Sequence, residues 1–234
     1  MEKWLLVGSC LVALVMIGWN IKTLSTLCSS EIKIIGSVLL SFTSLRYLTL
    51  ILYAYSMDLK LLVSIRYFYY ASSIGITMLT AIAVWYVIPV IQEQIQLKSY
   101  LLAFLPWDVF YIYLILKQPT KLVASSSYGY ELLLLPPFTR YLSIAQGSFI
   151  LIMLILCLIG IIKYKHLQIR VQLFVIILAQ ILLTIDGIAS GNETVRIFKL
   201  FTVTEAFALW TIFYAFTHAI KRSKGNVNRS LHME

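Results

Sequence analysis

The sequence predicts an all-α integral membrane protein folded as a bundle of seven transmembrane helices. Its residues are 60% hydrophobic and only 12% charged, whereas a soluble domain carries about 25% charged residues. The mean hydropathy is +0.88, and apolar runs of about 20 residues, long enough to cross a bilayer, recur along the chain. We therefore expect one membrane domain over residues 1–220 and a short basic cytoplasmic tail over residues 221–234.

Each apolar run is interpreted as one helix. The first run continues well past Cys10, further than in a cleaved signal peptide, so we expect an uncleaved helix. The third opens with the aromatic run Tyr67–Tyr70, which is typical of a membrane interface. Residues 106–108, Pro-Trp-Asp, interrupt the fourth run, where we expect a kinked helix rather than a break. The predicted spans are residues 4–21, 34–55, 67–90, 100–116, 141–162, 171–188 and 197–219.

The longest connection between spans covers residues 117–140. It contains the letters SSSYGY and a Pro-Pro pair, which are signals of turns. Two structures are compatible with it, a short hairpin or a cap over the bundle.

Lysine and arginine predict the orientation of the bundle. Seven spans place the two ends of the chain on opposite sides of the membrane. With the C-terminus inside, the inner segments hold ten Lys and Arg residues and the outer segments hold eight. The inner residues cluster in short loops and the tail, where the positive-inside rule has most force. We predict an outer N-terminus and an inner C-terminus.

The net charge of +9 would suggest nucleic acid as the partner of a soluble protein. Here Lys and Arg lie almost entirely between apolar runs, so they are interpreted as topology signals and contacts to lipid headgroups. We expect the lipid bilayer as a partner and no nucleic acid. Cys10, Cys28 and Cys157 have neither metal nor redox spacing and are interpreted as packing residues. No metal and no cofactor is expected.

Polar residues inside the predicted spans are the candidates for function. Charged groups at membrane depth cost at least a few kcal/mol, so they face the bundle interior, pair, or line a cavity. At 1.5 Å per residue, polar residues from six spans fall in the outer half or near the middle of the membrane. These residues are Arg46, Ser72, Ser73, Thr77, Asp108, Gln146, Gln180 and Glu205.

Two interpretations of this polar level overlap. In the first, Arg46 pairs with Glu205 or Asp108, and the amides hydrogen-bond across helices. In the second, the same residues form a water-accessible pocket that opens to the outside and binds a small polar or charged ligand. Asp186 and Asn192 are expected to lie at the membrane interface only.

Several chemistries are excluded by the residues present. Asp108 and Asp186 lie on two spans, as in an intramembrane aspartyl protease, but neither has the glycine-flanked context of that family. The sequence holds no His-Glu-x-x-His motif of metalloproteases. A retinal-binding lysine would lie in the middle of the last span, whereas Lys199 lies at its outer edge. We therefore expect no enzyme.

Three stretches resemble the seven-helix sensor domain at the N-terminus of bacterial histidine kinases. Residues 60–87, KLLVSIRYFYYASSIGITMLTAIAVWYV, are similar to its third span, and residues 137–185 have its two spans joined by a short basic turn. Residues 201–223, FTVTEAFALWTIFYAFTHAIKRS, resemble its closing helix. The resemblance implies a sensory domain in a bacterial cell membrane, with a ligand site facing outward.

The sequence after Arg222 departs from that family, because it holds no kinase module. We expect the basic residues Lys221, Arg222 and Lys224 to pass a signal to a separate protein, such as a kinase, or the chain to be a sensor lacking its output module. The alternatives are a small-molecule transporter or permease and a structural accessory subunit. Transporters often show internal repeats and broken helices. With 10 glycines, one interrupted span and no convincing repeat, the sequence favours a receptor.

Overall fold

The computed structural model describes residues 2–125, 129–190 and 201–226, and the side chains of residues 3–124, 129–186 and 202–218. It is mostly helical, with one short hairpin. In chain order the elements are α1 (Glu2–Leu27), α2 (Ser30–Tyr55), α3 (Leu59–Ile65), the 3₁₀-helix η1 (Arg66–Phe68), α4 (Ala71–Val87), α5 (Pro89–Gln94), α6 (Leu97–Leu102), α7 (Leu105–Lys117), β1 (Thr120–Ser125), β2 (Gly129–Leu134), α8 (Phe138–Lys163), α9 (Leu167–Ser190) and α10 (Phe201–Asn226).

Five helical segments in the described part are long and apolar enough to cross a membrane. Their outward faces carry apolar side chains, such as Val15 and Val38, that would be exposed to water in a soluble protein. The prediction of a multi-pass, mostly helical membrane protein is confirmed to this extent. The five segments are Lys3–Leu27, Ser30–Tyr55, Leu59–Val87, Phe138–Lys163 and Leu167–Asp186.

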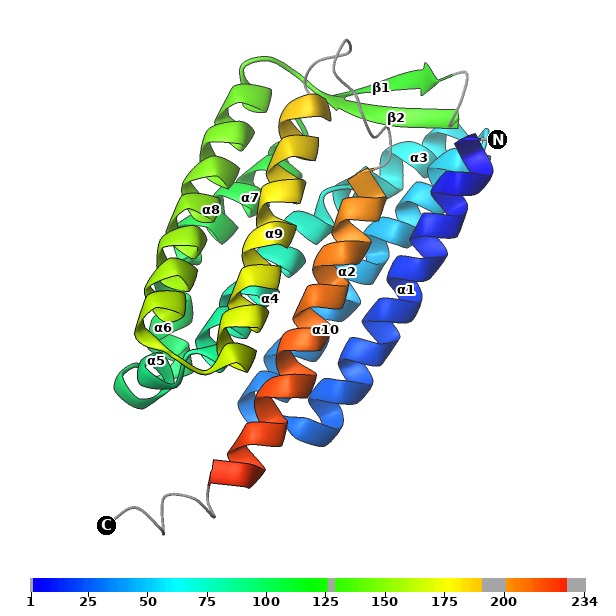
Figure 1. Cartoon of the computed structure of the whole chain (residues 1–234). Helices are drawn as coiled ribbons and strands as arrows, with labels where there is room; N and C mark the ends of the chain where they lie inside the picture. The colour runs from blue at the N-terminus through cyan, green and yellow to red at the C-terminus, as the bar shows by residue number, and fades with distance from the viewer. Residues whose placement is uncertain (1, 126–128, 191–200, 227–234) are drawn as a thin grey trace, which may run out of the picture.

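The long helices lie side by side along one direction. In Figure 1, α8, α9, α10 and α1 follow one another across the front of the bundle, and α2 and α4 lie behind them. Helix α10 packs against α1, α9 and α4, so it contacts both halves of the chain. The first helix begins at the end that carries the hairpin, which we call the hairpin end, and α10 ends at the opposite end.

Among the described side chains, α4 is the most buried of the long helices, with 14 of its 17 residues buried. Its small residues let neighbouring helices approach closely, and Gly75 shows how closely. A Cβ added at Gly75 would overlap the Thr43 Oγ1 of α2 and lie 3.0 Å from the Leu39 carbonyl oxygen. This packing brings the polar side chains of α4 to the centre of the bundle.

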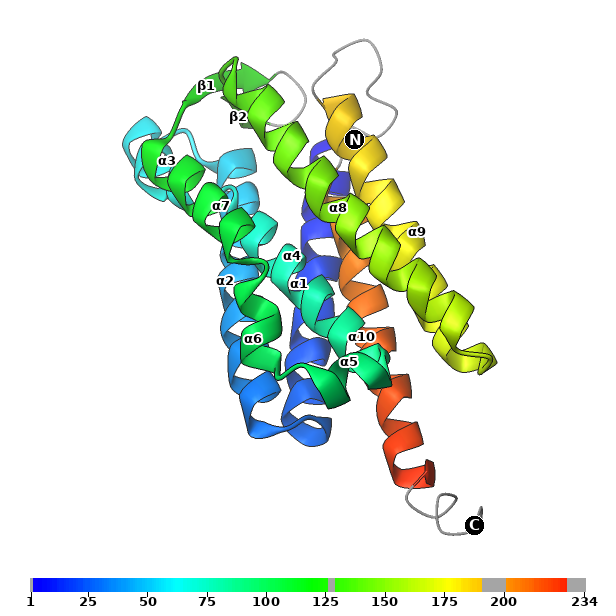
Figure 2. The same cartoon turned by 90° about the vertical axis from the view of Figure 1, so that its left-hand side faces the viewer.

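Residues 100–116, predicted as one kinked span, form two helices instead. Helix α6 ends at Leu102, and α7 begins at Leu105 after a turn at residues 103–104. Pro106 lies in the first turn of α7, where its missing N–H would have no helical partner in any case, while further inside a helix its ring would clash with a preceding carbonyl. Figure 2 shows α6 and α7 one above the other along the side of the bundle.

The third predicted span, residues 67–90, also differs from one continuous helix, and its later boundary is set by a proline. The aromatic opening lies in η1 and the turn before α4, and the helix ends at Val87 because Ile88, the residue before Pro89, is extended. A residue before proline is disfavoured in the helical conformation. Pro89 then starts the short helix α5.

The connection 117–140 contains an antiparallel hairpin, in which Thr120 pairs with Leu134 and Leu122 with Leu132. Leu132 is buried together with Tyr53 of α2 and Leu62 of α3. The hairpin therefore lies over the end of α2 and α3, so both sequence-based possibilities, a hairpin and a cap over the bundle, describe this segment.

Candidate functional site

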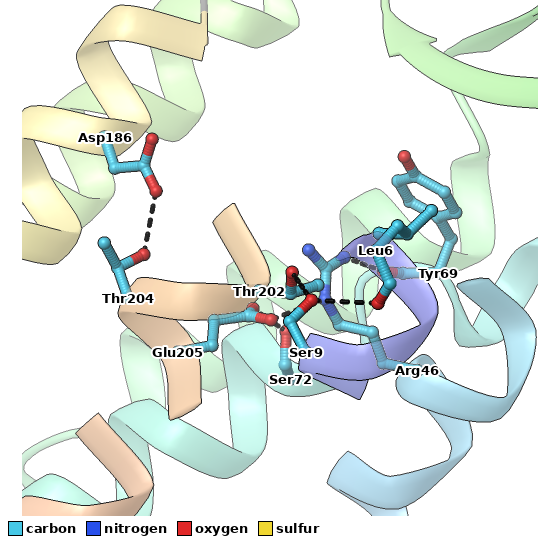
Figure 3. A network of polar contacts seen from close by, with 9 residues as sticks. All are labelled: Leu6, Ser9, Arg46, Tyr69, Ser72, Asp186, Thr202, Thr204 and Glu205. Atoms are coloured by element: carbon cyan, nitrogen blue, oxygen red, sulfur yellow. Dashed lines mark hydrogen bonds and ion pairs between the residues drawn. The ribbon is translucent and has the colours of Figure 1, made fainter. Parts of the chain in front are cut away.

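The centre of the site is a buried ion pair between α2 and α10. Arg46 Nε donates to Glu205 Oε2 at 3.1 Å, and the two residues are only 7% and 1% exposed. Arg46 also donates through Nη1 to the Tyr69 carbonyl oxygen, and its guanidinium lies 5.4 Å from the centre of the Tyr69 ring. Of the two sequence-based pairings, with Glu205 or with Asp108, the structure shows the first (Figure 3).

The second carboxylate oxygen of Glu205 faces α4. Ser72 Oγ donates to Glu205 Oε1 at 2.6 Å. The carboxylate thus receives hydrogen bonds from two helices, which compensates for its removal from water. Since Arg46 holds one oxygen and Ser72 the other, the orientation of the carboxylate is fixed.

Helix α10 has further polar contacts along its length. Thr202 Oγ1 lies 2.6 Å from Ser9 Oγ of α1, and Thr204 donates to Asp186 Oδ2 of α9 at 2.8 Å (Figure 3). Towards its other end, the side-chain amides of Asn20 and Gln172 donate to α10 carbonyls, those of Leu209 at 3.1 Å and Ala215 at 3.3 Å respectively. Polar contacts from α1, α2, α4 and α9 therefore set the position of α10.

A cavity of about 50 Å³ lies beside Glu205, between α4, α7, α8, α9 and α10. Since one water molecule needs roughly 10–15 Å³ measured in this way, the cavity can hold a few waters or the polar part of a small molecule. Six of the eight predicted site residues line it, together with five residues that the sequence did not single out. The predicted six are Ser72, Ser73, Thr77, Gln146, Gln180 and Glu205.

The cavity wall offers neutral hydrogen-bonding groups. Serine and threonine hydroxyls both donate and accept, and each glutamine amide has two donors and an acceptor. Gln180 Nε2 also donates to Thr80 Oγ1 at 3.1 Å, which holds its side chain between α9 and α4. The only ionised wall group among the described residues, Glu205, is compensated by Arg46.

Two predicted site residues do not line the cavity. Arg46 lies behind Glu205, on its α2 side, and acts on the cavity only through the carboxylate. Asp108 is in the first turn of α7, and its buried Oδ1 has no hydrogen-bond partner among the described residues. The favourable interaction that we identify for Asp108 is with the dipole of α7, because a helix N-terminus favours a nearby negative charge.

Sequence reasoning missed three parts of this site. Tyr111 lines the cavity, and its position one helical turn after Asp108 was the available signal. Asp186, predicted to lie only at the interface, is 4% exposed and accepts a hydrogen bond from Thr204. The contact between Ser9 and Thr202 joins the first and last helices. Nothing in the sequence of either helix indicates that the two side chains meet. Asn192 lies outside the described residues.

The predicted output residues Lys221, Arg222 and Lys224 fall on the last turns of α10, and their side chains lie outside the described ones. The three cysteines are packing residues, as predicted: Cys10 and Cys157 are fully buried in the main apolar cluster, and Cys28 packs against it.

No protein-family model matches the sequence, and no curated protein matches it either. The geometry of the site and the fold are therefore the basis for a functional proposal.

Proposed function

We propose that the protein is a receptor of the bacterial cell membrane that binds a small ligand in the cavity beside Glu205. The chain would cross the membrane seven times, with α6 and α7 together as the fourth crossing and α10 as the seventh. The five apolar segments support several crossings, and α10 runs beside α1 and α9. With the N-terminus outside, the hairpin end faces out.

The observation that carries the proposal is a cavity at the meeting point of polar side chains from four helices, α4, α8, α9 and α10. Polar groups that serve only to join helices would be expected to pack directly against one another. A concave site with a few convergent polar groups is instead typical of ligand binding. Polar groups within a membrane bundle often mark such functional sites.

Helix α10 provides a route for a signal. It lines the cavity through Glu205 and leads to Lys221, Arg222 and Lys224 at the opposite end. A ligand that binds one arrangement of the helices more tightly than another would shift the bundle towards that arrangement. A separate cytoplasmic protein, such as a kinase, would then detect the changed position of the α10 end. The resemblance to kinase sensor domains supports this mode of output.

A transporter is the second candidate. Its support is the pair of helix boundaries at Pro89 and Pro106, because transporters often build substrate sites from interrupted helices. In that case the same cavity would hold the substrate on its way across the membrane.

The experiment uses the purified full chain in lipid nanodiscs and a panel of small amino acids, sugars, alcohols and amides. We expect at least one compound to raise the melting temperature of the wild-type chain and of a Gln172→Leu control, but not that of Gln180→Leu. Both glutamines are buried on α9 and bond across helices, but only Gln180 lines the cavity. Compounds that stabilise both variants equally would contradict a site in this cavity.

The same compounds then distinguish the two candidates. A receptor ligand should change the fluorescence of a probe on the tail and should not accumulate in proteoliposomes. Uptake of the compound into proteoliposomes, lost in Gln180→Leu, would identify a transporter instead.

A further inference from the structure

A second, smaller cavity adjoins the first. It measures about 10 Å³ and is lined by Tyr70, Ser73, Tyr111, Leu114, Leu134 and Leu142. Ser73 and Tyr111 line both cavities. The two spaces therefore meet at the same two side chains.

The two cavities differ in chemistry. The larger cavity has hydroxyls and amides in its wall beside apolar residues of α4, α8 and α9. Three of the six residues that line the smaller one are leucines, one each from α7, β2 and α8. Leu134 ends β2 and Leu142 lies near the start of α8, so the smaller cavity is at the hairpin end. Together they form a polar compartment beside Glu205 and a small apolar compartment towards the hairpin end.

A ligand in the polar compartment does not need to be charged. Glu205 already has a guanidinium partner at 3.1 Å and a serine hydroxyl at 2.6 Å. A charged ligand would bring an uncompensated charge into the interior of the bundle, which strongly disfavours its binding. A neutral hydroxyl or amide finds both donors and acceptors on Ser72, Thr77 and Gln180.

We infer that the ligand is a small uncharged amphipathic molecule. Its hydroxyl or amide head occupies the larger cavity, and its short alkyl tail passes Ser73 and Tyr111 to lie among Leu114, Leu134 and Leu142. This inference rests on the proposed receptor function and names the class of ligand for the same site. The apolar cavity has about the size of one water molecule, so only about one carbon atom at the end of the tail fits in it.

The test uses the full chain in lipid nanodiscs, with Cys10, Cys28 and Cys157 replaced by alanine and with Thr77→Cys as a reporter in the larger cavity. The rate of modification by a water-soluble thiol reagent is measured alone and with 1-butanol or acetamide. We expect 1-butanol to protect the reporter at far lower concentrations than acetamide. At ten times its dissociation constant, it should slow modification about tenfold, because only the unoccupied fraction reacts.

Filling the apolar compartment should remove this protection. Leu114→Trp places a large ring in the smaller cavity, and Leu142→Trp does so from α8 if the first variant fails to fold. The matched control is Leu116→Trp, on the same helix at a position that is 69% exposed, and it should leave protection by 1-butanol unchanged.

Three results would overturn the inference. If 1-butanol still protects both Trp variants that fill the cavity, its tail lies elsewhere. If acetamide protects as well as 1-butanol, the site binds a polar ligand, and the receptor proposal stands without the amphipathic class. If the reagent does not modify Thr77→Cys in the absence of any compound, the cavity is closed and both proposals fail.

Discussion

Arg46 Nε lies 3.1 Å from Glu205 Oε2, although 159 positions separate the two residues in the chain. The pair joins the second and the last long helices at a buried point. It also turns the other carboxylate oxygen towards Ser72 and the cavity. One ion pair thus links the stability of the bundle to the shape of its candidate ligand site.

Breaking this pair should strongly destabilise the protein. Arg46→Ala leaves the Glu205 carboxylate buried with one hydrogen-bond donor, and loss of one partner of a buried pair costs about 3–5 kcal/mol. The free energy of unfolding, measured in mixed micelles by titration with a denaturing detergent, should fall by this amount. Arg46→Glu combined with Glu205→Arg should recover part of the loss.

The exposed ion pair between Lys98 and Glu31, at 3.3 Å, is the matched control. Since exposed pairs contribute about 0–1 kcal/mol, Lys98→Ala should change the unfolding free energy little. Additive effects of Arg46→Ala and Glu205→Ala in a double-mutant cycle would contradict a direct interaction.

Gly75 should not tolerate even one methyl group. In Gly75→Ala the new Cβ meets Thr43 and the Leu39 carbonyl, and overpacking of this kind costs about 1–3 kcal/mol. Gly147 of α8 has no heavy atom within 4 Å of the position of an added Cβ, so Gly147→Ala should be neutral or stabilising, as expected from the better helix propensity of alanine. Equal melting temperatures for the two variants would show that α2 and α4 are further apart than described.

Docking of the hairpin against the helices should depend on Leu132 and not on Leu133. Neighbouring residues of a strand point to opposite sides, and Leu132 is buried against α2 and α3 while Leu133 is exposed. Leu132→Ala should destabilise the docked hairpin by about 2–5 kcal/mol. Faster amide hydrogen exchange in β1 and β2 would report this loss. Equal exchange in Leu132→Ala and Leu133→Ala would mean that the hairpin does not dock through this face.

Cys28, in the connection between α1 and α2, should react slowly with alkylating reagents at neutral pH. Burial raises the pKa of its thiol to about 11, and only the thiolate is nucleophilic. Below that pKa its alkylation rate should rise about tenfold per pH unit, whereas the rate of an ordinary exposed cysteine levels off at about pH 8.5. Peptide mapping after brief alkylation at several pH values measures this. A plateau near pH 8.5 in the folded chain would mean that Cys28 is exposed.

The sequence predicts the apolar helices well because burial in lipid demands long apolar runs, which are local features of the chain. The hairpin was one of two possibilities for the connection at residues 117–140, since turn residues mark a turn without fixing what it packs against. The break at residues 103–104 was missed because Pro106 is compatible with a kink in a membrane helix as well as with the start of a new one.

The candidate site, too, was predicted in part from local features of the sequence and missed in part where it depends on packing. Depth along each helix can be estimated from residue number, so the polar side chains that line the cavity were identified together. Rotation of each helix about its axis cannot be read from depth, and for this reason the sequence does not show that Asp108, unlike Glu205, lies outside the cavity lining. Asp186 was assigned to the interface because it ends an apolar run, whereas its contact with Thr204 depends on how α9 and α10 pack.

The most direct test of a water-accessible ligand site is the labelling of Ser73→Cys from outside the cell. The cysteine-free chain is expressed in bacteria, and a charged, membrane-impermeant thiol reagent is added to intact cells. Ile155→Cys, on the lipid-facing side of α8 and 49% exposed, is the control. We expect Ser73→Cys to be modified rapidly and Ile155→Cys hardly at all. Equally slow modification of both, or modification of Ser73→Cys only after the inner side is exposed, would contradict an outward-facing cavity.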